Sequence, residues 1–161
     1  MKKKILIISG DPNSINSEII FKTWKILKKN LKKKIFLIGN HKLISDQFKK
    51  LRYNLHLEII KDLSKNHFSN NLKIVDIPLV FKNPFKVSYN NASKYVKKSL
   101  DLAHSFAKDQ KVKGIINCAI NKNLLNPIKK DGVTEYLASK CKINDHSEVM
   151  LIHNKKLSVV P

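Results

Sequence analysis

The sequence predicts one α/β domain organised around a parallel sheet. Short apolar runs rich in β-branched residues recur along the chain, as at 4–8 and 34–38, and such runs are typical of strands covered on both faces of a parallel sheet. Segments with apolar residues at helical spacing alternate with these runs. The 161 residues, of which 42% are hydrophobic, fit a single domain with its own core.

Two strand–loop–helix units are predicted first. A strand at 4–8 ends at Ser9-Gly10-Asp11-Pro12, and a helix follows with its apolar residues at helical spacing. A second strand at 34–38 is broken by Gly39 and Asn40 and leads into a helix at 43–51. The next strands are predicted at 55–60, which alternates and is expected to be more exposed, and at 72–80, where Pro78 favours an edge or a strand end.

The longest helix is predicted at 88–108, and it leads to the stretch that we interpret as the centre of the fold, residues 113–140. This stretch is predicted to contain a buried strand at 114–117, a polar turn, a short helical piece and a helix capped by Thr134. Two further strands are predicted at 148–152 and 157–160.

The formal net charge of +20 raises the question of nucleic-acid binding. All but one of the 32 basic residues are lysines, with Arg52 as the exception, whereas arginine is the residue that grips phosphates and guanine edges bidentately. We therefore interpret the lysines mainly as solvated surface. The alternative is a basic, non-catalytic module that binds nucleic acid or other anionic partners.

Several functional classes are excluded as motifs. The four glycines form neither a G-x-G-x-x-G fingerprint nor a P-loop, and the six histidines show no metal-ligand spacing. No apolar run reaches the roughly 18 residues of a membrane span, and no signal peptide is recognised. Because Cys118 and Cys141 have no C-x-x-C spacing, we expect neither a disulfide framework nor a zinc knuckle, and a cytoplasmic location.

Polar side chains gather where the predicted strand at 114–117 ends and helices begin, which is where ligands bind in open α/β sheets. Lys122 follows this strand and could hold an anionic group by charge and hydrogen bonding. Thr134 lies at a predicted helix start, whose unpaired N–H groups attract phosphate. The pattern predicts a pocket and leaves its reaction open.

Two segments together carry a family resemblance. Ile7-Ile-Ser-Gly-Asp-Pro12 with Asn16-Ser-Glu-Ile19 resembles the opening T-x-G-D-P-A-G-I-G-P-E-I of 4-hydroxythreonine-4-phosphate dehydrogenases. Asn117-Cys-Ala-Ile-Asn-Lys122 and Gly132-Val-Thr-Glu-Tyr-Leu-Ala138 resemble the T-x-P-I-N-K and G-H-T-E-F-L-A motifs of the same family, in the same order. The resemblance covers this whole chain and about the first half of a typical member.

The resemblance implies an α/β/α sandwich of the isocitrate/isopropylmalate-dehydrogenase-like type and a homodimer. It also implies the family reaction, in which NAD or NADP oxidises 4-phosphooxy-L-threonine in the synthesis of pyridoxal phosphate (vitamin B6). A divalent metal, Zn, Mg or Co, acts as the Lewis acid in that family. The partners implied are a phosphorylated small molecule and a second subunit, with neither a membrane nor nucleic acid expected.

The resemblance also transfers site residues. The substrate-contacting His-Thr pair of the family falls on Val133 and Thr134, so one polar contact is replaced by an apolar side chain. Lys122 and Asp11 are further candidates for the substrate site. The resemblance places the metal-binding histidines and most cofactor contacts beyond Pro161. We therefore expect residues 1–161 to be the N-terminal part of a two-domain dehydrogenase, inactive alone, with no catalytic or metal residue of its own.

Overall fold

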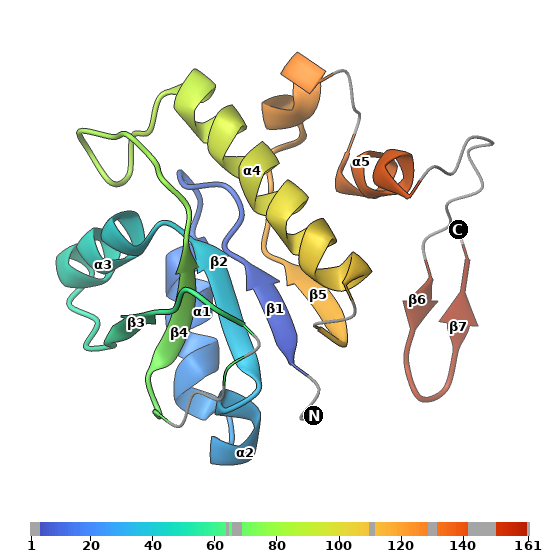
Figure 1. The fold of residues 1–161 in the computed structure, drawn as a ribbon, viewed down its shortest axis with the longest axis horizontal. Helices are drawn as coiled ribbons and strands as arrows, with labels where there is room; N and C mark the ends of the chain where they lie inside the picture. The colour runs from blue at the N-terminus through green and yellow to red at the C-terminus, as the bar shows by residue number, and fades with distance from the viewer. Residues whose placement is uncertain are drawn as a thin grey trace.

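Five parallel strands form the central sheet, in the order β3-β4-β2-β1-β5. The structure is a computed structural model that describes residues 4–63, 65, 69–109, 112–128, 132–141 and 151–160 (Figure 1). The strands are β1 (Ile5–Ile8), β2 (Ile35–Gly39), β3 (Leu57–Ile59), β4 (Leu72–Asp76) and β5 (Gly114–Asn117). All carboxyl ends of the strands therefore meet at one edge of the sheet.

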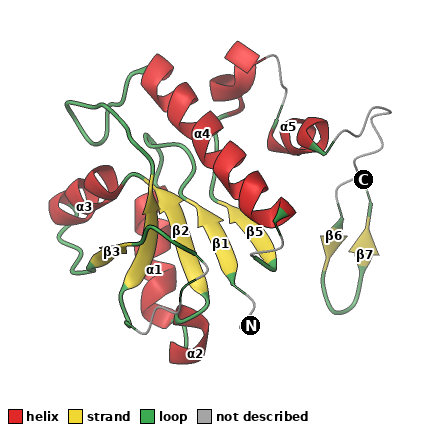
Figure 2. Cartoon of the chain, in the orientation of Figure 1, coloured by secondary structure: helices red, strands yellow, loops and turns green. Residues whose placement is uncertain are grey.

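Helices cover both faces of this sheet (Figure 2). Core residues of α1 (Asn16–Ile26) and of α3 (His41–Lys50) pack on one face, and α2 (Lys29–Lys32) follows α1. The long helix α4 (Tyr89–Lys108), the 3-10 helix η1 (Lys122–Ile128) and α5 (Val133–Lys140) contribute to the core on the other face. The arrangement is an α/β/α sandwich, as predicted.

The two middle strands explain the continuous apolar runs of the sequence. Leu6 and Ile8 of β1 lie with Phe36 and Ile38 of β2 in the core beneath α4. The alternate residues face the α1 and α3 side, where Leu37 is fully buried. Because successive side chains of a strand point to opposite faces, both faces of these strands have to be apolar.

Most of the predicted elements are confirmed, with bounds that differ at their ends. The strands predicted at 4–8, 34–38, 55–60 and 72–80 are β1, β2, β3 and β4, and the long helix is α4 with Ser88 as its N-cap. The strand that was expected to be more exposed is β3, which forms one edge of the sheet and carries the exposed Ile59. Gly39 belongs to β2 and does not break it, and Pro78 follows the end of β4.

The prediction that 114–117 is a buried, central strand is wrong. β5 forms the second edge of the sheet, paired with β1 alone among the described residues, and Ile116 is 55% exposed. A continuous apolar run does not reveal how many neighbours a strand has. The sheet is organised around β1 and β2, and β5 lies beside β1 at its edge.

Residues 151–160 form a separate two-stranded antiparallel sheet of β6 (Ile152–His153) and β7 (Ser158–Val159). Much of the strand predicted at 148–152 falls outside the described residues, and the strand predicted at 157–160 is shorter than expected. The apolar side chains of this hairpin are exposed, among them Ile152 and Val159.

Two lysines depart from the predicted solvated surface. Lys73 of β4 is fully buried and donates to the carbonyl oxygen of Ser69 at 2.7 Å, and its burial lowers the pKa of the ammonium group. Lys4 donates to the carbonyl oxygens of Leu63 and Lys65. Both side chains therefore hold the segment after β3. No helix in the described ranges has the length and apolar character needed to cross a membrane.

Candidate ligand site at the carboxyl edge of the sheet

The turn after β1 touches the turn after β5 directly. Gly10 has a φ of +75°, and a Cβ atom there would lie 2.5 Å from the carbonyl oxygen of Ala119 and 2.5 Å from Nδ2 of Asn16. Glycine is required for both reasons, because other residues rarely adopt this φ and any side chain would collide. Gly10, which belongs to the first sequence motif, therefore allows the backbone of that motif to approach the backbone of the second motif at Ala119.

Hydrogen bonds join the same two turns. The backbone N–H of Asp11 donates to the Ala119 carbonyl oxygen at 3.0 Å. The Asn16 side-chain amide donates to the carbonyl oxygens of Ser9 at 2.9 Å and of Ala119 at 2.7 Å. Asn16 is buried, so these bonds replace water for backbone groups that would otherwise be unsatisfied.

A third segment is attached to this pair of turns. Asn13 exchanges two hydrogen bonds with the backbone of Val87, at 2.9 Å and 2.7 Å. Gln47 of α3 donates from its amide to the carbonyl oxygens of Pro12 at 2.9 Å and of Pro84 at 2.7 Å. The turn after β1 is therefore held from both sides.

A buried phenol links the ends of β1 and β2. The Tyr95 hydroxyl of α4 lies 2.6 Å from the Ser9 hydroxyl and accepts from the backbone N–H of Asn40 at 3.0 Å. Burial raises the pKa of Tyr95 to about 12, although the hydrogen bonds with Ser9 and Asn40 oppose the shift. Tyr95 therefore stays neutral at ordinary pH, and its hydroxyl group holds Ser9 and the backbone of Asn40 in fixed positions.

Asp76 ends β4 beside the start of α3. Its carboxylate accepts from the backbone N–H of His41 at 2.7 Å, and the Asn40 side chain accepts from the N–H of Leu43 at 2.8 Å. These two groups satisfy N–H donors that a helix start leaves unpaired. The N–H groups of His41 and Leu43 at the start of α3 are thus already bonded to side chains of the protein and are not available to a ligand.

The predicted site residue Asp11 lies in the turn after β1. One oxygen of its carboxylate accepts from the backbone N–H of Asn13 at 2.8 Å, and its carbonyl oxygen accepts from the Ser14 hydroxyl at 2.8 Å. Asp11 therefore shapes its own turn in the manner of an Asx turn. Its backbone contact with Ala119 places it beside the segment that leads to Lys122.

Lys122 is the first residue of η1, and its side chain is exposed. Two residues of α4 hold η1 through its backbone, since the hydroxyls of Tyr89 and Ser93 donate to the carbonyl oxygens of Asn123 and Leu124, each at 2.6 Å. Within the described ranges no acidic side chain pairs with Lys122. Its ammonium group is available to an anion from solvent.

Val133 and Thr134 open α5. Val133 is partly buried and packs against the core beneath α4, whereas Thr134 is exposed. The prediction that Thr134 caps this helix is wrong, because the N-cap is Gly132 and Thr134 lies in the first turn. The Thr134 hydroxyl is therefore not used by a cap. Among the described residues, no hydrogen bond or ion pair joins any two of the four predicted site residues.

Asp101 of α4 positions α5. Its carboxylate accepts from the Tyr136 hydroxyl at 2.5 Å and forms ion pairs with Lys97 at 2.7 Å and Lys140 at 2.9 Å. Partial burial raises the pKa of this carboxyl, but the bonds from Lys97, Tyr136 and Lys140 together outweigh that effect and bring the pKa to about 2. Asp101 therefore stays charged and holds the helix that carries Thr134.

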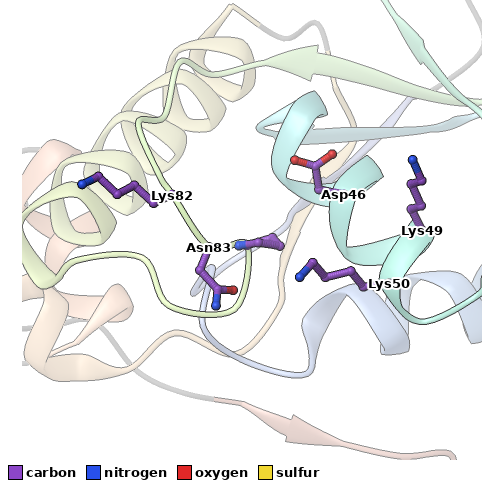
Figure 3. Close-up of a pocket in the computed structure, with 6 residues that line it drawn as sticks. Asp46, Lys49, Lys50, Lys82 and Asn83 are labelled. Carbon is purple, nitrogen blue, oxygen red and sulfur yellow. The ribbon is translucent and has the colours of Figure 1, made fainter.

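Two hollows lie near this edge. One of about 400 Å³ lies between α3, α4 and the segment after β4 and includes Asn40, Lys42 and Tyr95. The other, of about 610 Å³, is lined by Asp46, Lys49, Lys50, Lys82, Asn83 and Pro84. Figure 3 shows that Lys50 of this second hollow extends toward Asn83, whereas Lys82 points away from Lys49 and Lys50.

A metal site is not formed by the residues that the structure describes, since no three His, Cys, Asp or Glu side chains lie close enough together to hold an ion. The described residues therefore offer no fit for the divalent metal that the resemblance implies.

Sequence reasoning missed the residues that build the frame of the site. Asn13 and Asn16 look like ordinary helix caps in sequence, and Tyr95 looks like one of several apolar residues on a helix. Asp76 carries a usable signal, because it ends a strand as Asp11 follows one. Its partner at the start of α3 is 35 residues away in the chain, and local patterns do not specify such pairs.

The fold and the site together define the class of protein. A parallel sheet with helices on both faces, whose polar turns meet at the carboxyl ends of the strands, is typical of α/β proteins that bind small molecules at that edge. The family follows from comparison with known proteins. The family model of pyridoxal phosphate biosynthetic protein PdxA matches residues 30–161, and the chain belongs to this family. No curated protein sequence matches the chain.

Solved structures agree on the fold. A protein assigned as a 4-hydroxythreonine-4-phosphate dehydrogenase from Salmonella typhimurium has a TM-score of 0.84 and 24% identity, over 99% of this chain and 50% of that one. The 4-hydroxythreonine-4-phosphate dehydrogenase from Klebsiella pneumoniae has a TM-score of 0.82 and 24% identity, over 99% of this chain and 50% of that one. The 4-hydroxythreonine-4-phosphate dehydrogenase from Burkholderia phymatum has a TM-score of 0.83 and 20% identity, over 98% of this chain and 48% of that one. This chain spans about half the length of each.

The close approach at Gly10 predicts a large effect of one methyl group. Gly10→Ala should lower the free energy of unfolding by about 1–3 kcal/mol from its backbone conformation alone, with the collision at Ala119 added. Urea unfolding followed by circular dichroism measures the change. Gly114→Ala is the matched control, because nothing lies within 4 Å of its added Cβ. Equal effects of the two substitutions would contradict the contact described between the turns.

The Asp101 carboxylate predicts that α5 is released in acid. Its folded pKa of about 2 lies below the ordinary 3.8, so its stabilising effect is complete above the ordinary value and is lost as pH falls toward about 2. The protection of the α5 amides against hydrogen exchange, measured relative to an unstructured peptide at the same pH, should therefore fall over this range in the native protein. In Asp101→Asn the exchange should be fast already at neutral pH.

The control for this measurement is Asp46→Asn, which removes an exposed ion pair with Lys42 on α3. It should leave exchange in α5 unchanged. An unchanged acid profile of α5 in Asp101→Asn would show that another contact holds the helix.

Proposed function

We propose that the chain forms part of the substrate site of a 4-hydroxythreonine-4-phosphate dehydrogenase. In this reaction NAD or NADP oxidises the hydroxyl of 4-phosphooxy-L-threonine, as a step in pyridoxal phosphate (vitamin B6) synthesis. Membership of the PdxA family supports this proposal. The cytoplasm is the compartment we propose, with which the free thiols of Cys118 and Cys141 agree.

One observation carries the proposal. The segments that resemble the first two family motifs, around Gly10 and around Ala119, are far apart in sequence and are joined by hydrogen bonds at the carboxyl edge of the sheet. Ligands bind at this edge in parallel α/β sheets. Motif resemblance without such contact would have given no support for a shared pocket.

Each candidate residue has a proposed part in binding. Lys122 attracts the phosphate by charge, and the Thr134 hydroxyl donates a hydrogen bond to the same substrate. Val133 occupies the position of a family histidine and offers only apolar contact. Asp11 fixes the turn that approaches the substrate. These are binding and positioning parts, and none of the four residues transfers the hydride.

We expect the oxidation itself to depend on groups other than these four residues. The resemblance gives the metal-binding histidines of the family no counterpart among the 161 residues. We therefore expect the chain by itself to bind the substrate without oxidising it.

Calorimetric titration with 4-phosphooxy-L-threonine tests the site. Thr134→Val and Lys122→Gln should each weaken binding by about fivefold to tenfold, because each removes one hydrogen-bonding or charged contact to the ligand. Thr23→Val on α1 and Lys28→Gln beside α2 are matched controls at exposed positions and should leave the affinity unchanged. Val133→His should strengthen binding.

Three results would count against the proposal. Equal losses of affinity in the site variants and in the control variants would show that the ligand is bound only through the net charge of the protein. Tighter binding of an oligonucleotide than of the substrate, with steep salt dependence, would favour the basic binding module. Lack of any gain in Val133→His would favour a different phosphorylated acid as the ligand.

We further propose that the protein is a homodimer in which the β6–β7 hairpin contacts the second subunit. Ile152 and Val159 are cross-strand partners, and both side chains are exposed. An isolated two-stranded sheet is marginal in water, and an apolar partner surface would stabilise it by covering these residues.

Light scattering during size-exclusion chromatography tests the dimer. The native chain should show twice its mass of 18.5 kDa, and Ile152→Lys should return it to the single mass. Lys155→Gln at the neighbouring turn should leave the dimer intact. A dimer that persists in Ile152→Lys would remove the hairpin from the interface.

A further inference from the structure

The smaller hollow near the carboxyl edge has a distinctive lining. It measures about 400 Å³ and lies between the start of α3, the segment that follows β4 and one face of α4. The lining consists of three lysines, two asparagines, a tyrosine and a short apolar wall, namely Lys42, Lys94, Lys98, Asn40, Asn91, Tyr95, Pro78, Leu79 and Val80. We call it the α3–α4 groove.

Two of the three lysines that line the α3–α4 groove, Lys94 and Lys98, are not part of an acid–lysine pair among the described residues. On α1, α3 and α4, the acid–lysine pairs Glu18–Lys22, Asp46–Lys42 and Lys97–Asp101 are spaced four residues apart. Lys94 and Lys98 are also four residues apart on α4, but both are cationic, and such a pair is mutually repulsive. Within the described ranges neither has an acidic partner.

The frame of the α3–α4 groove is fixed by hydrogen bonds. The Asn40 side chain donates to the Ile77 carbonyl oxygen at 2.8 Å, and the Asn91 side chain donates to the Val80 carbonyl oxygen at 2.9 Å. The Tyr95 hydroxyl is held by Ser9 and Asn40. The walls are therefore formed in advance, and only the lysine side chains have to be ordered when a ligand binds.

Lys42 can join the other two lysines at little cost. It pairs with Asp46 at 2.7 Å while its side chain remains 74% exposed, and such exposed pairs contribute little to stability. An anion in the α3–α4 groove can therefore recruit Lys42 from this pair. It would also relieve the repulsion between Lys94 and Lys98.

The size and the walls of the α3–α4 groove restrict the ligand. A volume of about 400 Å³ fits a small organic molecule, and Pro78, Leu79 and Val80 offer it an apolar surface. A polynucleotide would need a continuous basic track, whereas Lys82 of the second hollow points away from Lys49 and Lys50 (Figure 3). The charge and the apolar wall together favour a compact phosphate ester.

We propose that the α3–α4 groove is a second ligand site, which binds a small phosphate ester. Lys42, Lys94 and Lys98 hold the phosphate, and Leu79 and Val80 contact the organic part. None of these residues belongs to the proposed substrate site at Lys122, Val133 and Thr134. The inference therefore stands independently of the proposed function.

Calorimetry with adenosine diphosphate and with pyrophosphate tests this site and separates the two sources of phosphate. At 0.15 M salt, adenosine diphosphate should bind more tightly than pyrophosphate, because only the former reaches the apolar wall. The double variant Lys94→Gln/Lys98→Gln should weaken binding of both by about tenfold or more. The matched control is Lys28→Gln/Lys29→Gln, which removes the same charge at exposed positions next to α2.

The control double variant should bind adenosine diphosphate within about twofold of the native chain. The Lys94/Lys98 double variant should keep its affinity for 4-phosphooxy-L-threonine. Absence of binding, equal losses in both double variants, or a parallel loss of oligonucleotide binding in the Lys94/Lys98 variant would each overturn the proposal. Tighter binding of pyrophosphate than of adenosine diphosphate would overturn the assignment to an ester.

Discussion

The backbone contact between the turns after β1 and β5 constrains the whole carboxyl edge of this protein. The Ala119 carbonyl oxygen accepts from the Asp11 N–H and from the Asn16 side chain, and it leaves no room for a side chain at Gly10. Since β1 and β5 pair in parallel, a shift of either strand would break this contact. The positions of Asp11 and of the segment that leads to Lys122 therefore depend on the register of the sheet.

This dependence explains which parts of the fold were accessible from sequence. Strands and helices follow from local periodicity, and β1, β2 and α4 were predicted nearly as they occur. The number of neighbours of a strand depends on segments far away in the chain, and for this reason β5 was placed at the centre when it lies at the edge. The short apolar run around Ile116 would look the same in the sequence of a central strand and of an edge strand.

The candidate site shows the same division. Asp11 and Lys122 stand out because polar residues after strands follow a general rule of parallel sheets. The side chains that position them, Asn16 and Tyr95, act through partners far away in sequence. Lysines show a comparable spread of roles that composition alone conceals, from the buried Lys73 to Lys94, which has no acidic partner in the described part of the chain.

The exposed outer side of β5 has a consequence for how such a fold can be assembled. Within the described residues β5 is bonded on one side, so every second backbone amide and carbonyl points outward, as at any sheet edge. A parallel neighbour from the same chain needs a long crossover to reach this edge. A strand from a separate polypeptide needs none, so pairing with a strand of another chain is geometrically open at β5.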